Sequence, residues 1–167
     1  MALSKDLCGV LAVGIEKEKA AHDFYVQAGE KTLLPLGKKM FKMLAAEETK
    51  HEKLLESWSA AGACPVGAVV GDVAQDLLKK GEAKLQKDVK PDTGDVQAIE
   101  VGQDMERKAI AFYAEAAAKA ADKASKDLFG RLEGEERKHL ALLTDLYEYM
   151  RNPNLWSVRD ERANFDS

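Results

Sequence analysis

The sequence contains one pattern twice, at an offset of 88 residues and without a gap. The offset aligns identical residues along both copies: Glu18 with Glu106, Ala21 with Ala109, Phe24 with Phe112, Tyr25 with Tyr113, Phe41 with Phe129, Leu44 with Leu132, Glu48 with Glu136, His51 with His139, and Leu55 with Leu143. Self-similarity of this kind is typical of a supersecondary unit that is repeated and buries its apolar face against its copy. The sequence therefore predicts two similar halves that pack with approximate two-fold symmetry.

Helix-breaking residues divide the chain at a few places. Proline and glycine occur together at 35–37, 62–65 and 91–94, and Pro153 follows near the end. The stretches between them are rich in Ala, Glu, Lys and Leu and lack the alternation typical of strands. These boundaries predict an all-α chain with long helices at about 4–32, 36–61, 95–121 and 125–150, and a shorter helix at about 72–89 with Asp72 as its N-cap.

The expected helices suit an up-down four-helix bundle made of two helical hairpins. A chain of 167 residues with 46% hydrophobic residues is long enough to bury a core as a single domain. We expect the bundle at 1–150, with the repeats at about 4–61 and 95–150, a connection at 62–94 and a C-terminal tail at 151–167.

Charge and cysteine content argue against several classes of partner. The 25 Lys and Arg residues are interspersed among 29 Asp and Glu residues, so the chain lacks the basic stripe of nucleic-acid binders. The apolar run from Leu7 to Ile15 is too short to span a membrane. Cys8 and Cys64 form no CxxC pair, which predicts neither a zinc ribbon nor a disulfide framework but two thiols in a reducing compartment. We therefore expect a cytoplasmic protein with no nucleic-acid and no membrane partner.

Acidic residues and histidines interrupt the apolar stripe of the long helices at matched positions. The second helix has the spacing of a core-facing helix at Phe41, Leu44, Glu48, His51, Leu55 and Trp58. The fourth helix repeats it at Phe129, Leu132, Glu136, His139, Leu143 and Leu146. In the first and third helices, Glu18 and Glu106 share a face with apolar residues seven positions away. Each long helix is thus expected to bury a carboxylate near its middle.

Four buried carboxylates require compensating positive charge, because an unpaired buried charge destabilises the folded state by several kcal/mol. The stripes contain no Lys or Arg, whereas two divalent cations would neutralise Glu18, Glu48, Glu106 and Glu136. A Glu from each of two helices and a Glu-x-x-His from each of the others is a known arrangement for a di-iron or di-manganese centre. The sequence therefore predicts two divalent metal ions held by these glutamates with His51 and His139, a ligand set that suits Fe or Mn and that Zn could also occupy.

Four segments resemble the rubrerythrin branch of the ferritin-like di-iron proteins: EKAAHDFY from Glu18 to Tyr25, ETKH from Glu48 to His51, ERKAIAFY from Glu106 to Tyr113, and ERKH from Glu136 to His139. The resemblance covers about residues 4–150 and implies a ferritin-like four-helix bundle. It also implies that Glu48 and Glu136 bridge the two irons, while Glu18 and Glu106 are terminal ligands. His51 and His139 would each supply one imidazole.

The resemblance also suggests roles for residues beside the ligands. Tyr25 and Tyr113 would hydrogen bond to ligand carboxylates, the alternative being simple core packing. His22 lies one turn after Glu18 and could serve as an extra ligand, but its repeat partner is Ile110, which favours an ordinary helix residue. Full rubrerythrins carry an additional glutamate on the third helix, whereas Gln103 and Ala109 flank Glu106 here.

Three functions are compatible with such a centre. The first is an oxidoreductase that acts in oxidative stress and reduces hydrogen peroxide or O2, as the resemblance implies. Because two cysteines cannot form the four-cysteine rubredoxin site of full rubrerythrins, its electrons would come from a separate donor protein. The second is an iron-binding or ferroxidase-type protein, and the third is a structural bundle stabilised by metal. The long amphipathic helices, the connection at 62–94 and the apolar residues of the tail favour a homodimer, in which the similar halves would allow hairpins to be exchanged between subunits.

Overall fold

The computed structural model describes residues 5–62, 64 and 94–152 of the chain. These residues form four helices and no strand: α1 (Lys5–Lys31), α2 (Pro35–Ala61), α4 (Asp95–Lys119) and α5 (Lys123–Arg151). The expected all-α bundle is confirmed, and each expected long helix is found within about two residues of its predicted ends. The short helix expected at 72–89 and the tail beyond residue 152 lie outside the described residues.

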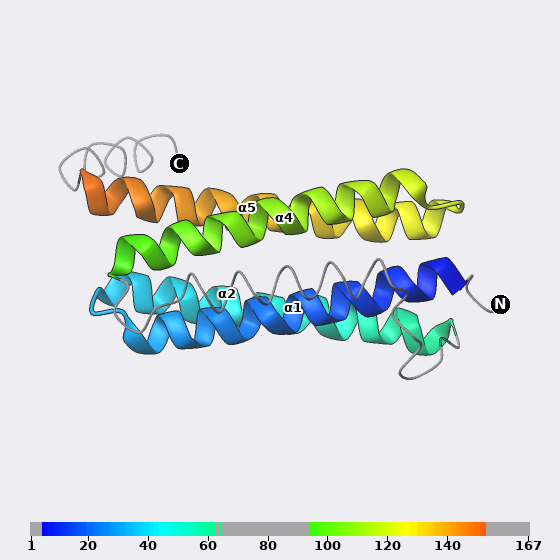
Figure 1. Ribbon diagram of the computed structural model, residues 1–167, viewed down its shortest axis with the longest axis horizontal. Coiled ribbons are helices and arrows are strands. Elements are labelled where there is room, and N and C mark those ends of the chain that lie inside the picture. Colours follow the sequence, from blue (N-terminus) through cyan, green and yellow to red (C-terminus); the bar gives the residue numbers. More distant parts are fainter. Residues whose placement is uncertain (1–4, 63, 65–93, 153–167) are drawn as a thin grey trace, which may run out of the picture.

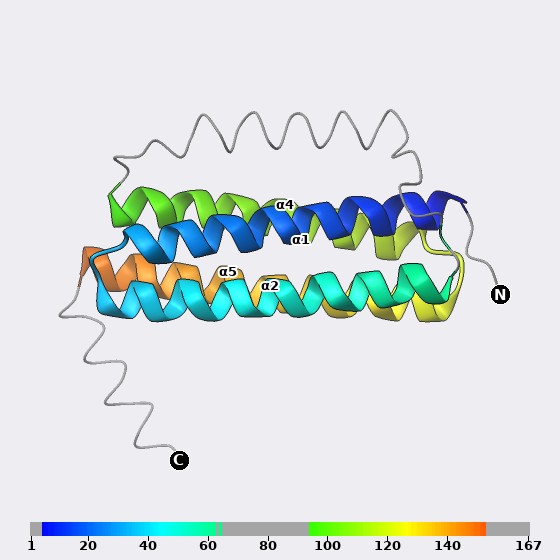
Figure 2. The same cartoon turned by 90° about the horizontal axis from the view of Figure 1, so that it is seen from below.

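The four helices form two antiparallel hairpins, α1–α2 and α4–α5, that lie face to face (Figure 1). Turned by 90°, the bundle shows α1 beside α4 and α2 beside α5 (Figure 2). The closest backbone packing lies within each hairpin. This arrangement follows from the repeat, because each amphipathic hairpin leaves one apolar face that its copy can cover.

The two hairpins begin their second helix by different means at equivalent positions. Pro35 occupies the first turn of α2, after Leu34 in extended conformation and without a side-chain cap. At the matching position of the second hairpin, Asp122 caps α5 by accepting a hydrogen bond from the Ser125 backbone N–H at 2.8 Å. A proline at the first helical position and an aspartate at the N-cap both favour helix initiation.

The core consists of two apolar clusters. One surrounds Tyr25, Phe41 and Leu44, and the other surrounds Tyr113, Phe129 and Leu132, which are the repeat partners of the first three. Each of the four helices contributes buried residues to both clusters, one on either side of its middle, where the acidic residues occur. The sequence pattern therefore places a polar layer between two apolar ones.

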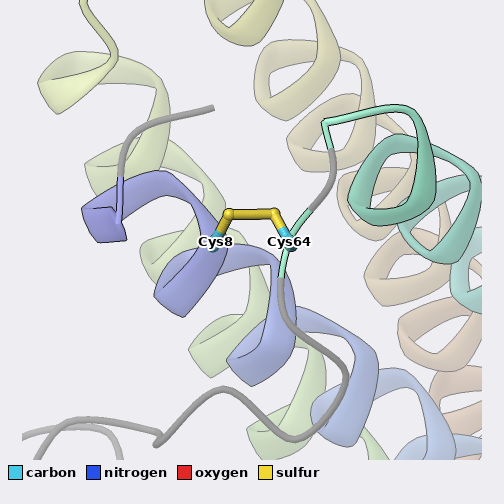
Figure 3. The surroundings of a disulfide bond; sticks show 2 residues. All are labelled: Cys8 and Cys64. Carbon is cyan, nitrogen blue, oxygen red and sulfur yellow. A yellow bond between two sulfur atoms is a disulfide. The ribbon is translucent and has the colours of Figure 1, made fainter. Parts of the chain in front are cut away.

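The cysteines correct the sequence-based prediction. Cys8 and Cys64 form a disulfide, although the sequence analysis predicted two free thiols (Figure 3). The two cysteines are separated by 56 positions in the sequence, and the chain between them follows α1 in one direction and α2 in the other. The antiparallel hairpin thus brings the start of one helix to the end of the other. Because disulfides persist in oxidising environments, the cysteines no longer support the expected reducing compartment. No described helix combines the length and the apolar character that a membrane span requires.

Candidate metal centre

Six polar side chains meet at the middle of the bundle, one from α1, one from α4 and two from each of α2 and α5. All are buried: Glu18, Glu48, His51, Glu106, Glu136 and His139. Glu48 and Glu136 are the most enclosed, with 0% and 1% of their surface exposed. Because Glu and His are three residues apart on α2 and on α5, both side chains of each pair point from the same helical face into the bundle.

The six side chains form two overlapping groups, each with ligand atoms within 4.8 Å of one another. One group contains Glu18, Glu48, His51 and Glu136, and the other contains Glu48, Glu106, Glu136 and His139. Glu48 and Glu136 belong to both groups, whereas each remaining residue belongs to one. The geometry thus provides two adjacent sites with two carboxylates between them.

Each imidazole presents its Nδ1 atom to three carboxylates. His51 Nδ1 lies 3.4 Å from Glu18 Oε2, 3.3 Å from Glu48 Oε2 and 3.1 Å from Glu136 Oε1. His139 Nδ1 lies 3.1 Å from Glu48 Oε1 and from Glu136 Oε2, and 3.7 Å from Glu106 Oε1. The two rings stack with their centroids 5.3 Å apart. The two halves of the centre therefore repeat each other in geometry as well as in sequence.

Several buried atoms of this cluster make no hydrogen bond with the described part of the chain. They are both carboxylate oxygens of Glu48, Glu136 Oε1 and His51 Nδ1. Buried polar atoms are normally hydrogen bonded, and exceptions call for a bound ion or a functional role. Carboxylate and imidazole ligands suit Fe, Mn and Zn. The residues present therefore fit a pair of divalent cations.

Two buried tyrosines hold the carboxylates that belong to one group each. Tyr25 on α1 donates its hydroxyl hydrogen to Glu106 Oε1 on α4, and Tyr113 on α4 donates to Glu18 Oε1 on α1. Both tyrosine rings are fully buried and stack on phenylalanines, Phe41 and Phe129. Each hairpin thus orients a glutamate of the other.

Without metal, burial makes Glu18 and Glu106 retain protons at neutral pH. Desolvation raises the pKa of Glu18 well above its usual value, and the neighbouring carboxylates Glu136 and Glu48 raise it further. Desolvation, followed by the charges of Glu48 and Glu136, raises the pKa of Glu106 to about 10. A protonated carboxyl avoids the repulsion of like charges in a buried site.

The pKa values of both histidines are raised, which favours the positively charged imidazolium form. Burial by itself lowers the pKa of His51, but the close carboxylates of Glu136, Glu18 and Glu48 outweigh it and raise the pKa to about 12. The pKa of His139 rises to about 10, because the close carboxylates of Glu136 and Glu48 likewise outweigh burial.

The same contacts lower the pKa values of the two shared carboxylates. Burial raises the pKa of Glu48, yet the close imidazoles of His139 and His51 bring it down to about 2. The pKa of Glu136 is also lowered, since the same two imidazoles outweigh its burial. Two imidazolium ions thus balance two carboxylates in the metal-free cluster, and metal ions would displace protons on binding.

His22 does not join the cluster. Its ring is 37% exposed and its Nδ1 atom lies 3.0 Å from Asp23 Oδ1. This placement agrees with the reading of an ordinary helix residue.

Gln103 is a buried neighbour that the repeat did not reveal. Its Nε2 donates to Thr144 Oγ1 at 3.2 Å, linking α4 to α5. Its partner at the repeat offset is Ile15, so a search for matched polar residues passes over it.

Comparison with known proteins gives one family and one fold. The sequence model of the family described as Rubrerythrin matches residues 9–147. No curated protein matches the chain. A solved structure from Anabaena variabilis, of a two-domain protein containing DJ-1/ThiJ/PfpI-like and ferritin-like domains, covers 89% of this chain with a TM-score of 0.67 and 16% identity. The chain spans 41% of that protein, and at this identity the likeness shows the fold alone.

Proposed function

We propose, from the premise that the chain belongs to the rubrerythrin family, that it is a non-haem di-iron oxidoreductase that reduces hydrogen peroxide or O2. The observation that carries the proposal is the pair of overlapping ligand groups that share Glu48 and Glu136. Sharing two carboxylates brings two metal ions close enough to act together on one small oxidant. A role in oxidative stress is part of this proposal.

In this proposal Glu48 and Glu136 would serve as ligands of both irons, because both groups contain them. Glu18 and His51 would help to hold one ion, and Glu106 and His139 the other. Two bound ferrous ions would supply one electron each to the reduction of peroxide to two molecules of water, which also consumes two protons. Mn and Zn are alternative occupants of the same ligands, but Zn has no redox chemistry to offer.

The chain's own residues would serve this reaction in two ways. The two apolar clusters lie on either side of the metal-binding residues and limit the access of bulk water. The exclusion of water strengthens every electrostatic interaction inside the site. Tyr25 and Tyr113 hold the oxygen atoms of Glu106 and Glu18 by hydrogen bonds, so that each carboxylate keeps one orientation.

The electrons would come from a separate donor. The four-cysteine site of a rubredoxin has no counterpart in the described residues, whose two cysteines are joined to each other. We propose a donor protein as the partner, and a homodimer as the assembled form. The cytoplasmic location stays a proposal, which the Cys8–Cys64 disulfide does not support.

Iron handling is the second candidate. The cluster is rich in carboxylates, and such ligands bind ferrous iron and favour its oxidation. In that case the protein would oxidise or store Fe(II) without repeated turnover with a reductant. The bundle would be a metal-stabilised structural unit if neither activity is found, since the ions would still neutralise buried acids.

Metal analysis combined with rapid mixing tests the proposal. Protein loaded with Fe(II) without oxygen should contain about two metal ions per chain and be oxidised by peroxide much faster than by O2. Equal rates with both oxidants would favour iron handling over peroxide reduction. One metal ion or none per chain would refute the two-metal centre.

A further inference from the structure

We infer that Gly14 and Gly102 are positioning residues, which lack a side chain so that Tyr113 and Tyr25 can lie across the helices and reach Glu18 and Glu106. The two glycines occupy the same place in the two repeats, 88 residues apart. Each lies one turn before the glutamate that receives the tyrosine hydrogen bond. The inference rests on the proposed metal centre for its significance, although its geometry does not require a bound ion.

Gly102 on α4 lies against the ring of Tyr25. A Cβ atom at this position would be 3.3 Å from Tyr25 Cε1, 3.2 Å from Leu143 Cδ1 and 3.5 Å from Phe24 Cε1. The first two distances are shorter than ordinary van der Waals contact, so the neighbours would have to give way. The Tyr25 ring is fully buried and stacked on Phe41, with ring centroids 6.1 Å apart, so it cannot move without disturbing the core.

Gly14 on α1 occupies the equivalent position against the other tyrosine. A Cβ atom there would be 3.0 Å from Leu55 Cδ1, 3.5 Å from the Tyr113 hydroxyl and 3.7 Å from Phe112 Cε1. The tight contact is thus with Leu55, the repeat partner of Leu143, and the tyrosine is reached at ordinary contact distance. We therefore expect the two glycines to act on their tyrosines by different routes, directly at Gly102 and through Leu55 at Gly14.

The helix glycines differ in how closely a side chain would approach its neighbours. A Cβ atom at Gly9 of α1 or at Gly130 of α5 would meet no neighbour within 4 Å, whereas one at Gly37 of α2 would be 3.1 Å from Thr32 Oγ1, near the turn and away from the tyrosines. Glycine is a poor helix former, so an alanine at these open sites should stabilise the helix. Close packing therefore explains the absence of a side chain at Gly14 and Gly102, whereas it does not explain the glycines at positions 9 and 130.

The consequence for the centre follows from the hydrogen bonds. Each tyrosine holds the glutamate that belongs to one metal site alone, and outer contacts of this kind typically change metal affinity by 10–100-fold. Displacing a tyrosine from its glutamate should therefore weaken the site on that side. The two carboxylates shared by both sites have no tyrosine partner among the described contacts.

Proton NMR of the full-length protein tests the inference, because both the metal-free and the Zn(II)-loaded forms are diamagnetic. A buried hydroxyl that is hydrogen bonded to a carboxyl should give a slowly exchanging downfield signal. Two such signals are expected, one abolished by Tyr25→Phe and the other by Tyr113→Phe. Gly102→Ala should shift or abolish the Tyr25 signal and leave that of Tyr113 in place, while Gly130→Ala should change neither.

Zn(II) affinity provides the second measurement. Gly102→Ala should lower it about tenfold or more, and Gly102→Ala added to Tyr25→Phe should lower it little further. If Gly102→Ala does not fold, a background of Tyr25→Ala with Leu143→Val removes both atoms in tight contact with the new methyl group, and there the substitution should raise the urea midpoint as Gly130→Ala does. A lower midpoint in that background would overturn the inference.

Gly14→Ala should disturb the Tyr113 signal, and adding Leu55→Val should restore it by removing the atom in tight contact. An unchanged Tyr25 signal in Gly102→Ala, or an equal change in Gly9→Ala and Gly130→Ala, would overturn the inference. Failure of the proposed function is seen separately, as a wild-type protein that keeps both hydroxyl signals but is not oxidised by peroxide.

Discussion

The two hairpins match at their middles and differ at their ends. At the middle, each supplies a lone glutamate, a Glu-x-x-His pair, a tyrosine and a close glycine at equivalent positions. At the open end, Cys8 and Cys64 close the first hairpin, whereas Val96 and Asn152 occupy the matching positions of the second. At the turn, Pro35 initiates α2 and Asp122 caps α5.

This difference shows which parts of a hairpin its partner constrains. The middle of each hairpin completes the site of the other, since each tyrosine and each shared glutamate contacts residues across the bundle. The features that differ at the ends each lie within one hairpin, such as the Cys8–Cys64 bond in the first and the Asp122–Ser125 hydrogen bond in the second. Substitution of a ligand that both groups share should therefore affect both metal sites, whereas a substitution at one of these ends should leave the sites intact.

The largest effect should come from a shared ligand. Glu48→Ala is expected to abolish binding of both metal ions, because Glu48 belongs to both ligand groups. Glu106→Ala removes a ligand of one group and should leave about half of the metal. Metal per chain, measured after gel filtration, separates these outcomes. Equal loss in the two variants would show that the division into shared and unshared ligands is wrong.

The pH dependence of the metal-free protein should be the next largest effect. Unfolded carboxyls ionise near pH 4.5 and unfolded histidines near 6.5, whereas the folded protein keeps protons on Glu106 to about 10, on His139 to about 10 and on His51 to about 12. The folded state therefore binds more protons between pH 4.5 and 10, and its stability falls as pH rises, by up to about 1.4 kcal/mol per pH unit for each group. Below pH 4.5, protonation of Glu48, whose folded pKa is about 2, reverses the trend.

Urea unfolding of the metal-free protein across this range measures the effect. The metal-loaded protein should behave oppositely, because metal displaces the extra protons and binds more tightly as pH rises. Glu106→Gln removes one of the titrating groups and should flatten the profile of the metal-free protein. A metal-free stability that rises steadily from pH 5 to 9 would contradict the protonation described for the cluster.

Removing the disulfide should destabilise the protein by about 4 kcal/mol, the chain-entropy value for a loop of this length. The comparison is between the oxidised wild-type protein and a Cys8→Ser, Cys64→Ser double variant in urea. The variant should keep its metal, because neither cysteine belongs to the ligand groups. Treatment with a thiol reductant should lower the stability of the wild-type protein and leave that of the variant unchanged.

The smallest effect should come from the turn of the second hairpin. Asp122→Ala removes the cap on the Ser125 N–H and is expected to cost about 1 kcal/mol. Pro35→Ala in the first hairpin should cost about half as much, since its effect is on the freedom of the unfolded chain. Thermal unfolding of both variants, with metal bound, measures separately how much each of the two turns contributes to the stability of the protein.

The repeat was enough to predict the middle of the molecule. Glu48 and His51 recur at a fixed offset within an apolar stripe, so their burial and their meeting with Glu136 and His139 followed from helix periodicity. Residues without a polar repeat partner were harder to find. Gln103 aligns with Ile15, and its contact with Thr144 depends on how α4 packs on α5.

The disulfide was missed for a physical reason. Sequence reasoning judged Cys8 and Cys64 by their separation along the chain and by the absence of a CxxC pair, whereas their pairing depends on the equal lengths of α1 and α2. Gly14 and Gly102 were also passed over. An alignment of the repeats does contain them, but a glycine becomes informative only when the ring that lies over it is known.

The Cys8–Cys64 bond makes the first hairpin a closed covalent ring that runs through α1, the turn and α2. Leu33, at the tip of that turn, is 93% exposed and is accessible to a protease. A cut there would open the ring without dividing the molecule, so a denaturing gel would show one band until a reductant is added. A cut in the turn between α4 and α5 would give two bands in either case. The gel pattern after brief proteolysis would thus record the redox environment in which the protein was kept.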